Sequence, residues 1–127
     1  MPEAVEAAIR MSPLDQMHAQ PSAVMTDRDG WSVPASYGDP LFEYAAIREG
    51  GAGLIDLSSR GRLLVSGSEA VQFLNGLITN DVKTLELQHW MPAVFPNVQG
   101  RLLAGVRVIR RDDGFLIDTE SSTHEVV

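Results

Sequence analysis

Residues 101–110 (RLLAGVRVIR) have the residue types and spacing that offer the clearest chemistry in this sequence. Side chains of a β-strand alternate between two faces, so one face of this segment would be apolar: Leu102, Ala104, Val106 and Val108. The other face would place two arginines and a glycine among apolar neighbours: Arg101, Leu103, Gly105, Arg107 and Ile109. A guanidinium donates hydrogen bonds to carbonyl or carboxylate oxygens, and a glycine lets a ligand approach the backbone. The pattern predicts either a face that binds a small anionic ligand or a solvated strand face with a kink at Gly105.

The spacing of the histidines and aspartates gives less support to metal binding or acid–base catalysis. His18, His89 and His124 are far apart and lack ligand spacing, so we expect surface or core residues rather than metal ligands. Asp56 and Asp81 could form a carboxylate pair, but no pattern brings them together, and Asp81 is more simply a turn or capping residue. From spacing alone, the sequence indicates no catalytic set and no metal site.

The net charge of −7 is unevenly distributed along the 127 residues. Residues 1–50 hold eight acidic and three basic side chains, residues 51–111 hold four and seven, and residues 112–127 hold five and none. The pI near 4.8 argues against direct nucleic-acid binding, which needs a basic footprint. The basic middle segment still favours a small anionic ligand.

The composition also bears on the cellular compartment. The sequence contains no cysteine, which excludes disulfides and thiolate-bound clusters within the chain. Its apolar runs are far shorter than the roughly 20 residues that span a bilayer. Its first residues, MPEAVEAAIR, lack the charged-then-apolar order of a signal peptide. These features predict a cytoplasmic protein without membrane contact.

Capping residues and apolar periodicity divide the chain into elements of both types. Predicted helices cover residues 13–19 and 40–49, and a third follows Gly67-Ser68 and ends at residues 79–81. A hairpin is predicted within residues 23–37 around Asp29-Gly30, and Pro34 should make its second arm an edge strand or an irregular segment. The predicted strands are 53–58, 62–67, 89–95, 101–110 and 114–119. This order predicts an α+β fold, with a mainly antiparallel sheet and helices packed on one side.

Four segments, in this order, resemble the N-terminal part of the glycine-cleavage T-protein superfamily, which includes the aminomethyltransferases and the YgfZ-type folate-binding proteins. They are 12-SPLDQMH-18, residues 31–82, 97-NVQGRLL-103 and 115-FLIDTESS-122. The most specific motifs are Leu77-x-Thr79-Asn80-Asp81-Val82 and Asn97-x-Gln99-Gly100-Arg101. Full-length members are much longer. The resemblance therefore assigns residues 1–11 to an N-terminal extension and residues 12–127 to the N-terminal part of a folate-binding domain.

The resemblance implies an α+β fold that binds tetrahydrofolate or a folate derivative. The family's ligand-facing residues fall on the strand face described above, at Gly105, Arg107 and Ile109, and near Asp118 and Thr119 at the end of the next strand. The implied site residues are Asn97, Arg101, Gly105, Arg107 and Thr119. We expect Arg107 to donate to a folate carbonyl or carboxylate and Gly105 to leave space for the flat ring.

The resemblance also distinguishes two branches of the superfamily. Aminomethyltransferases carry two consecutive aspartates where Ala104 and Gly105 stand here, and the second is their catalytic carboxylate. Fixed charges supply much of such catalysis. The sequence therefore predicts no catalytic residue, and a YgfZ-type accessory role in iron–sulfur enzyme maintenance or tRNA modification. The alternatives are an aminomethyltransferase or folate-dependent demethylase with a carboxylate from elsewhere, and a structural fragment that binds no small molecule.

The expected partners follow from the same resemblance. Folate is the expected ligand, without direct contact to nucleic acid or membrane. A sheet without the later strands of full-length members exposes an edge, and exposed edges pair with other copies. We therefore expect self-association, most simply as a homodimer.

Overall fold

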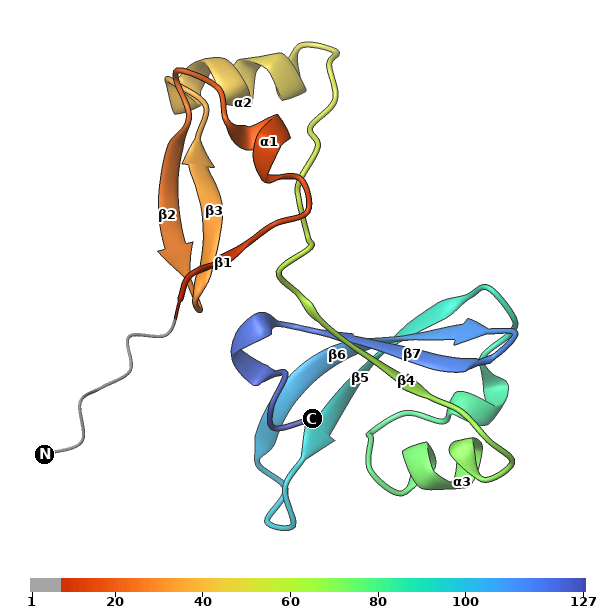
Figure 1. The fold of residues 1–127 in the computed structure, drawn as a ribbon. Coiled ribbons are helices and arrows are strands. Elements are labelled where there is room, and N and C mark those ends of the chain that lie inside the picture. The colour runs from red at the N-terminus through yellow and green to blue at the C-terminus, as the bar shows by residue number, and fades with distance from the viewer. Residues whose placement is uncertain (1–7) are drawn as a thin grey trace, which may run out of the picture. The chain divides into compact units, whose positions relative to one another are not determined.

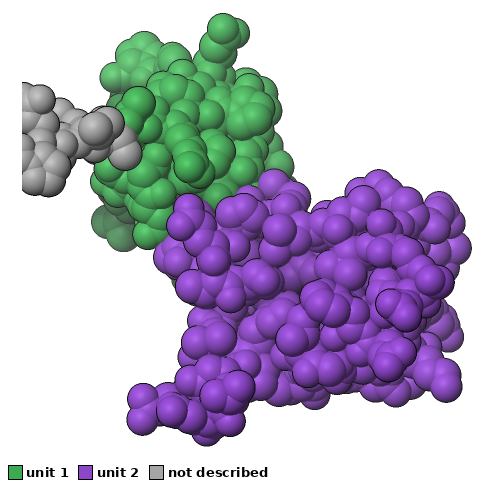
Figure 2. All heavy atoms as spheres, turned by 60° about the horizontal axis from the view of Figure 1, so that its bottom comes forward, with its two compact units in different colours: residues 1–59 green, residues 60–127 purple. Residues whose placement is uncertain are grey.

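A computed structural model describes residues 8–127, which form two compact units that meet in the sequence between Ser59 and Arg60 (Figures 1 and 2). Unit 1 ends at Ser59, and unit 2 runs from Arg60 to Val127. Each unit has its own sheet and helices, and both sheets are mainly antiparallel. The predicted α+β class is confirmed.

Unit 1 is built on a three-stranded sheet in the order β1-β3-β2. Its elements are β1 (Arg10–Met11), α1 (Asp15–His18), β2 (Val24–Arg28), β3 (Trp31–Ser36) and α2 (Pro40–Arg48). β2 and β3 form the predicted hairpin, since Asp29 and Gly30 both adopt the positive φ that a tight turn requires, 54° and 75°. Residues 1–7 of the predicted extension lie outside the described residues, whereas β1 pairs in parallel with β3.

Pro34 lies in β3, which is the middle strand of the unit 1 sheet rather than the predicted edge strand. β1 reaches only Trp31 and Ser32, however. Among the described residues, β3 at Pro34 therefore pairs with β2 alone. A residue without an N–H donor is tolerated at such a position.

α2 begins where Asp39-Pro40 predicts a helix start. The Asp39 carboxylate accepts a hydrogen bond from the Leu41 N–H at 2.9 Å, and proline stands in the first turn. The predicted strand over residues 53–58 is wrong, because this segment forms no strand or helix. Side-chain hydrogen bonds around Asp56, rather than a strand ladder, hold it to unit 1.

Unit 2 contains a four-stranded antiparallel sheet in the order β4-β7-β6-β5. Its strands are β4 (Gly61–Val65), β5 (Trp90–Pro96), β6 (Leu102–Arg111) and β7 (Gly114–Thr119). Its helices are α3 (Ala70–Asn75) and the 3-10 helices η1 (Val82–Thr84) and η2 (Ser121–Thr123). The four strands predicted for this region are confirmed. Nowhere in residues 8–127 is a helix long and apolar enough to cross a membrane.

The hydrophobic core lies between one face of the unit 2 sheet and the segment that contains α3 and η1 (Figure 1). Every buried apolar side chain among the described residues belongs to it: Ala70, Leu74, Ile78, Val82, Leu85, Ala93, Phe95, Ala104, Val106, Val108, Phe115 and Ile117. Burial of a large apolar side chain contributes about 1.5–3 kcal/mol. The alternation predicted for β6 is present, because Ala104, Val106 and Val108 are buried while Gly105 and Arg107 are exposed.

Two details of unit 2 differ from the predicted pattern. Leu102 was expected on the apolar face but is 67% exposed, because the β5–β6 register shifts at that end of the strand pair. α3 ends at Asn75, earlier than predicted. The Asn75 side chain turns to the following loop, donating to Asp81 at 2.6 Å and accepting from the Val82 N–H at 2.9 Å.

Candidate functional site

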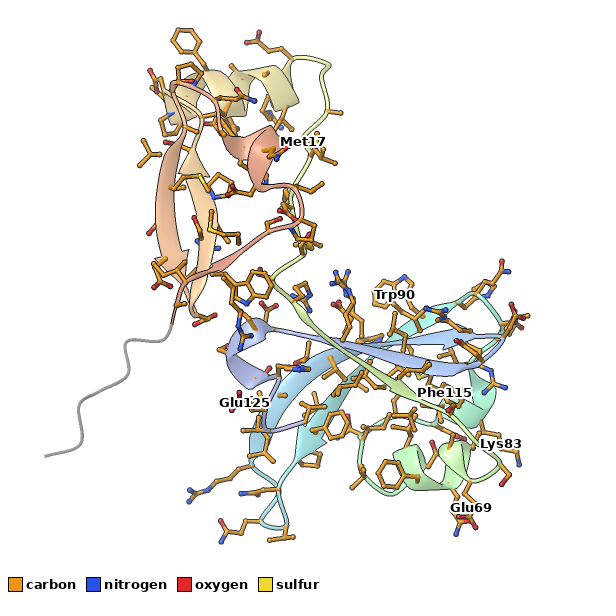
Figure 3. All side chains as sticks on the ribbon, viewed as in Figure 1. Met17, Glu69, Lys83, Trp90, Phe115 and Glu125 are labelled. Carbon is orange, nitrogen blue, oxygen red and sulfur yellow. The ribbon has the colours of Figure 1, made fainter. Side chains whose placement is uncertain are left out.

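One face of the unit 2 sheet lies opposite the core. The residues of β6 that were predicted to face a ligand lie on it, and we call it the open face. Cross-strand partners share a face, so the registers assign to it Arg62, Leu64, Trp90, Pro92, Val94, Gly105, Arg107, Ile109, Leu116 and Asp118. Figure 3 shows Trp90 on this side of the sheet and Phe115 on the side of α3. Trp90 is 60% exposed and Phe115 is 1% exposed, so one face is accessible and the other is core.

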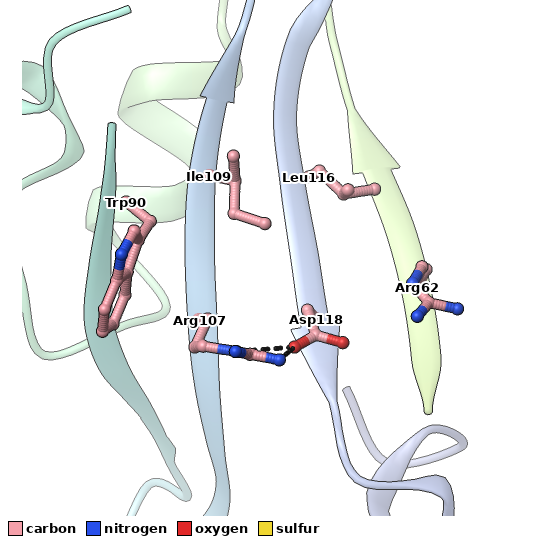
Figure 4. A pocket seen from close by; sticks show the side chains of 6 residues that line it. All are labelled: Arg62, Trp90, Arg107, Ile109, Leu116 and Asp118. Carbon is pink, nitrogen blue, oxygen red and sulfur yellow. Dashed lines mark hydrogen bonds and ion pairs between the residues drawn. The ribbon is translucent and has the colours of Figure 1, made fainter. Parts of the chain in front are cut away.

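A pocket of about 280 Å³ lies on the open face (Figure 4). Its lining combines apolar and charged side chains: Trp90, Ile109, Leu116, Arg62, Arg107 and Asp118. Ligand pockets commonly measure about 300–1,000 Å³. The volume of this pocket lies just below that range.

Asp118 is the centre of the charged part of this pocket. The residue is 3% exposed, and its carboxylate accepts hydrogen bonds from two guanidinium groups. Arg60 Nε lies 2.9 and 3.0 Å from the two carboxylate oxygens, and Arg107 donates to Oδ2 through Nε, at 2.7 Å, and through Nη2. Arg60 also pairs with Glu120. A buried carboxylate remains an anion only when it is paired in such a way.

These hydrogen bonds also determine the ionisation of Asp118. Burial alone would raise the pKa of its carboxyl group, but the hydrogen bonds from Arg60 and Arg107 outweigh burial and hold the pKa below its ordinary value. Asp118 is therefore an anion at neutral pH, with both oxygens occupied. The site can donate hydrogen bonds to a ligand, whereas Asp118 is poorly suited to accept a proton from one.

Gly105 and Arg107 are the two predicted site residues that the structure brings together on the open face. They lie one pleat apart on β6. A Cβ atom placed on Gly105 would meet no atom within 4 Å, so the space above the strand is free. The Arg107 side chain is 44% exposed, which leaves part of its guanidinium accessible. Contact of either residue with folate stays a prediction.

Asn97 and Arg101 lie in the turn that joins β5 to β6 and do not line the pocket. The Asn97 Oδ1 atom accepts hydrogen bonds from the N–H groups of Gln99 and Arg101, both at 2.9 Å. The Asn97 N–H donates to the Arg101 carbonyl at 2.8 Å. Asn97 therefore closes this turn, and ligand contact by Asn97 or Arg101 stays a prediction.

Thr119 lies on the core face of β7, because its side chain alternates with that of Asp118. It is 0% exposed, and its hydroxyl forms a hydrogen bond of 2.7 Å with the Thr123 hydroxyl. A ligand on the open face cannot reach this side chain. The placement therefore does not support the predicted contact through Thr119, and Asp118 takes that position on the open face.

Arg60 and Trp90 are site residues that the sequence reasoning missed. Arg60 binds a carboxylate 58 positions later in the chain, and no local spacing signals such a pair. A signal for Trp90 did exist, because the short turn after β5 implies antiparallel pairing with β6. That pairing places Trp90 opposite Ile109 and hence on the face of Arg107.

Unit 1 contains a separate group of polar side chains around Asp56. Asp56 accepts hydrogen bonds from the Ser12 hydroxyl and from His18 Nε2, the latter at 2.8 Å, and His18 Nδ1 bonds the Tyr37 hydroxyl. Burial would raise the Asp56 pKa, but hydrogen bonds from Ser12, Ser58 and His18 lower it strongly. Ser12 and His18 are both 7% exposed, so His18 is a core residue. The cluster ties three separate segments of unit 1 together.

Comparisons with known sequences identify relatives of this chain. The family described as the GCVT N-terminal domain matches residues 14–127. An aminomethyltransferase of Streptomyces coelicolor is 30% identical over 120 residues, which covers 94% of this chain and 32% of that protein. An aminomethyltransferase of Koribacter versatilis is 34% identical and covers 95% of this chain and 33% of the relative. These relatives give no support to the predicted YgfZ-type accessory role and favour the aminomethyltransferase alternative.

A solved structure shares the fold. The glycine cleavage system aminomethyltransferase T from Bartonella henselae matches with a TM-score of 0.78 at 20% identity, over 94% of this chain and 33% of that chain. This chain therefore spans about a third of the length of these three proteins. Because the family match extends over residues 14–127, the chain belongs to the GCVT N-terminal domain family.

Proposed function

We propose that this chain binds tetrahydrofolate on the open face of unit 2, as part of a protein of the aminomethyltransferase type. The proposal is supported by one observation above all: an accessible sheet face combines an apolar wall, an open glycine and an arginine fixed by a buried carboxylate. The ring system of folate is flat and carries a carbonyl oxygen. An apolar wall matches its flat surface, and a guanidinium matches the oxygen.

Each residue of the site has a distinct role in this proposal. Trp90, Ile109 and Leu116 provide the apolar lining, and Gly105 leaves space above β6. Arg107 donates to an oxygen of the ligand. A hydrogen bond to a charged group contributes about 1.5–3 kcal/mol, which is enough to decide whether a ligand of this size binds measurably.

Calorimetric titration of the full chain with tetrahydrofolate tests binding. We expect measurable heat, and we expect Arg107→Ala to weaken the affinity about 10-fold or more, since a charge-assisted hydrogen bond is lost. Arg111→Ala is the matched control, because it removes an equal charge from the same strand, where Arg111 pairs with Asp113. An absence of heat at high micromolar ligand would contradict the proposal.

Aminomethyl transfer is the activity that the names of the relatives favour. The open face provides hydrogen-bond donors for this chemistry. It provides no carboxylate at position 105, which is a glycine. Asp118 lines the pocket, yet both its oxygens are occupied by guanidinium groups. These two observations favour a second candidate function, in which the chain binds folate without carrying out transfer.

An assay of methylenetetrahydrofolate formation from an aminomethyl donor separates the two candidates. A product formed by the wild-type chain supports transfer, whereas binding without product supports the second candidate. Gly105→Asp sharpens the result, because the site has room for a side chain. If a carboxylate at this position is the missing group, Gly105→Asp raises the rate and the isosteric, uncharged Gly105→Asn does not.

A further inference from the structure

β4 and β5 are the two edge strands of the unit 2 sheet, and they differ in their capacity to pair with a further strand. Figure 4 shows β4, marked by Arg62, at the side of the sheet beyond β7. Within residues 8–127, β7 is the only strand that pairs with β4, and an edge strand can add another strand through backbone hydrogen bonds. β5 contains Pro92 and Pro96, which lack the N–H donor that such pairing uses. The sheet is therefore more readily extended at β4.

A groove of about 540 Å³ lies at the end of β4. It is lined by Leu64 and Val65 of β4, by residues 66–69, and by Ala70 and Phe73 of α3. Leu64 is 50% exposed and Phe73 is 57% exposed, so apolar surface faces solvent directly beside the sheet edge. A strand that pairs with β4 would gain apolar contacts from this groove in addition to its backbone hydrogen bonds.

We propose that β4 of a second copy of the chain occupies this edge, antiparallel to β4, with Leu64 opposite Leu64 of the other copy. Antiparallel pairing of a strand with itself has two-fold symmetry, so both copies use the same surface. Opposite residues share a face of the sheet. In this register Leu63 stands opposite Val65 of the other copy, and Arg62 stands opposite Ser66. Apolar side chains thus meet apolar side chains, and the arginine meets a small polar residue.

Other registers of the same strand fit less well. Centring the pair on Arg62 would place two guanidinium groups opposite each other, and directly opposed like charges destabilise a sheet. Centring it on Leu63 would place the charged Arg62 opposite the apolar Leu64. Centring it on Val65 would extend the pairing to Gly67, whose φ of 107° is not that of a strand. A two-fold axis between two residues would join the core face of one copy to the open face of the other.

The core faces of the two copies become continuous in this arrangement. Leu63 and Val65 already pack against the core of their own unit. Phe73 lines the groove beside Val65, so it would cover Leu63 of the other copy. An aromatic side chain offers about 150–250 Å², and a Phe73 ring that is 57% exposed can bury on the order of 100 Å².

The size of the contact determines the strength of the pairing. β4 has only five residues, so the buried area stays below the roughly 800 Å² per partner of a stable interface. The dimer is therefore weak and reversible. The contact lies at the edge of the sheet and requires no bound ligand.

The sequence contains no cysteine, so introduced cysteines can test the pairing by disulfide formation in the full chain. Opposite residues of antiparallel strands have Cα atoms about 4.5–5.5 Å apart, which a disulfide can span. Leu64→Cys should form a disulfide-linked dimer about 10-fold faster than Val98→Cys, because paired cysteines have a high effective concentration. Val98 is the matched control, since it is exposed and lies in the β5–β6 turn. Equal rates would indicate random collision and overturn the proposal.

Mixtures of two cysteine variants test the register. Arg62→Cys mixed with Ser66→Cys should form a mixed disulfide, which mass spectrometry identifies. Arg62→Cys should form no disulfide dimer by itself and little mixed disulfide with Leu64→Cys. A dimer of Arg62→Cys alone, or a mixed disulfide that favours Leu64→Cys over Ser66→Cys, would show that the proposed register is wrong. Thermal unfolding shows whether each variant folds.

Hydrogen exchange of the unmodified chain keeps the proposal testable if a cysteine variant fails to fold. Backbone amides of β4 should become more protected as the protein concentration rises through the micromolar range, while those of β5 should not change. Phe73→Ala should reduce this gain in protection, whereas Phe42→Ala, at an exposed ring of unit 1, should leave it unchanged. Protection that is independent of concentration, or that increases at β5 instead, would contradict pairing through β4. All these experiments are made without folate, so their outcome is independent of the proposed function.

Discussion

The two units of this chain are stabilised by different means, although each combines a small sheet with short helices. In unit 2, α3, η1 and the four strands bury an apolar core that includes Leu74 and Phe115, both 1% exposed. In unit 1, the buried side chains among the described residues are polar, Ser12 and His18. Most of its large apolar side chains are exposed, as for Phe42 at 77%. Hydrophobic burial therefore stabilises unit 2, whereas the hydrogen bonds around Asp56 stabilise unit 1.

This difference has an energetic consequence. A buried large apolar side chain contributes about 1.5–3 kcal/mol, whereas a hydrogen bond contributes about 0.5–1.5 kcal/mol net. Unit 2 should therefore be the more stable unit. It is also the unit with the open face, so the proposed ligand site lies on the more stable unit.

The largest effect is expected from a truncation in the unit 2 core. Phe115→Ala should lower the free energy of unfolding of unit 2 by about 3–5 kcal/mol, because it leaves a cavity among buried apolar side chains. Phe42→Ala is the matched control in unit 1 and should change the free energy by less than about 0.5 kcal/mol, since its ring is exposed. Urea unfolding followed by tryptophan fluorescence measures both. Similar losses for the two variants would show that the comparison of the units is wrong.

An intermediate effect is expected from the polar cluster of unit 1. His18→Ala leaves the partly buried Asp56 carboxylate without one of its donors, which costs about 1–3 kcal/mol. Hydrogen exchange of backbone amides should show faster opening of β2 and β3 and no change in β6 and β7. His89→Ala, at a side chain that is 68% exposed, should change neither unit. Destabilisation of β6 and β7 by His18→Ala would contradict the assignment.

Each unit also contains a carboxylate whose lowered pKa makes its stability depend on pH. The pKa values of Asp56 in unit 1 and Asp118 in unit 2 both lie below the ordinary value of about 3.9. As pH falls through that value, the unfolded chain takes up protons before the folded chain does, so stability decreases. We expect both units to lose stability below about pH 4, and unit 1 to unfold first because none of the apolar side chains in residues 8–59 is buried.

Single-tryptophan variants measure this acid response. Trp31 fluorescence reports unit 1 and Trp90 fluorescence reports unit 2 during acid titration. Asp118→Asn should flatten the pH dependence of unit 2 stability while that of unit 1 is unchanged. Stability that increases as pH falls from 5 to 3 would be the opposite of what both carboxylates predict.

The smallest effect is expected in self-association. We propose that the chain pairs through β4, an edge strand of the unit 2 sheet whose Leu64 is 50% exposed. The opposite edge strand, β5, contains Pro92 and Pro96, and proline disfavours edge pairing. Sedimentation should show dimers at tens of micromolar, and Leu64→Lys should shift them to monomers. If the wild-type chain is a monomer at this concentration, the proposed pairing through β4 is wrong.

Local signals allowed much of the fold to be predicted. The turn at Asp29-Gly30, the cap at Asp39 and the alternation along β6 each depend on a few neighbouring residues, and all three were predicted. The segment 53–58 was misassigned because an apolar run becomes a strand only when a partner strand is available. That condition depends on tertiary structure, which local pattern does not contain.

The candidate site was predictable where it depends on the alternation of side chains along a strand. This alternation places Gly105 and Arg107 on one face of β6, and the structure agrees. Thr119 was assigned through the resemblance, without regard to the alternation of side chains along β7. That alternation places Asp118, rather than Thr119, on the open face. The pairing of Arg60 with Asp118 joins residues 58 positions apart, and only the fold brings them together.

Folate binding on the open face is tested most directly by a crystal structure of the full chain with bound tetrahydrofolate. We predict ligand density over β6 above Gly105, with the ring against Trp90 and its carbonyl oxygen within hydrogen-bond distance of Arg107. Density on the α3 side of the sheet, against unit 1 alone, or at no site of the chain would contradict this.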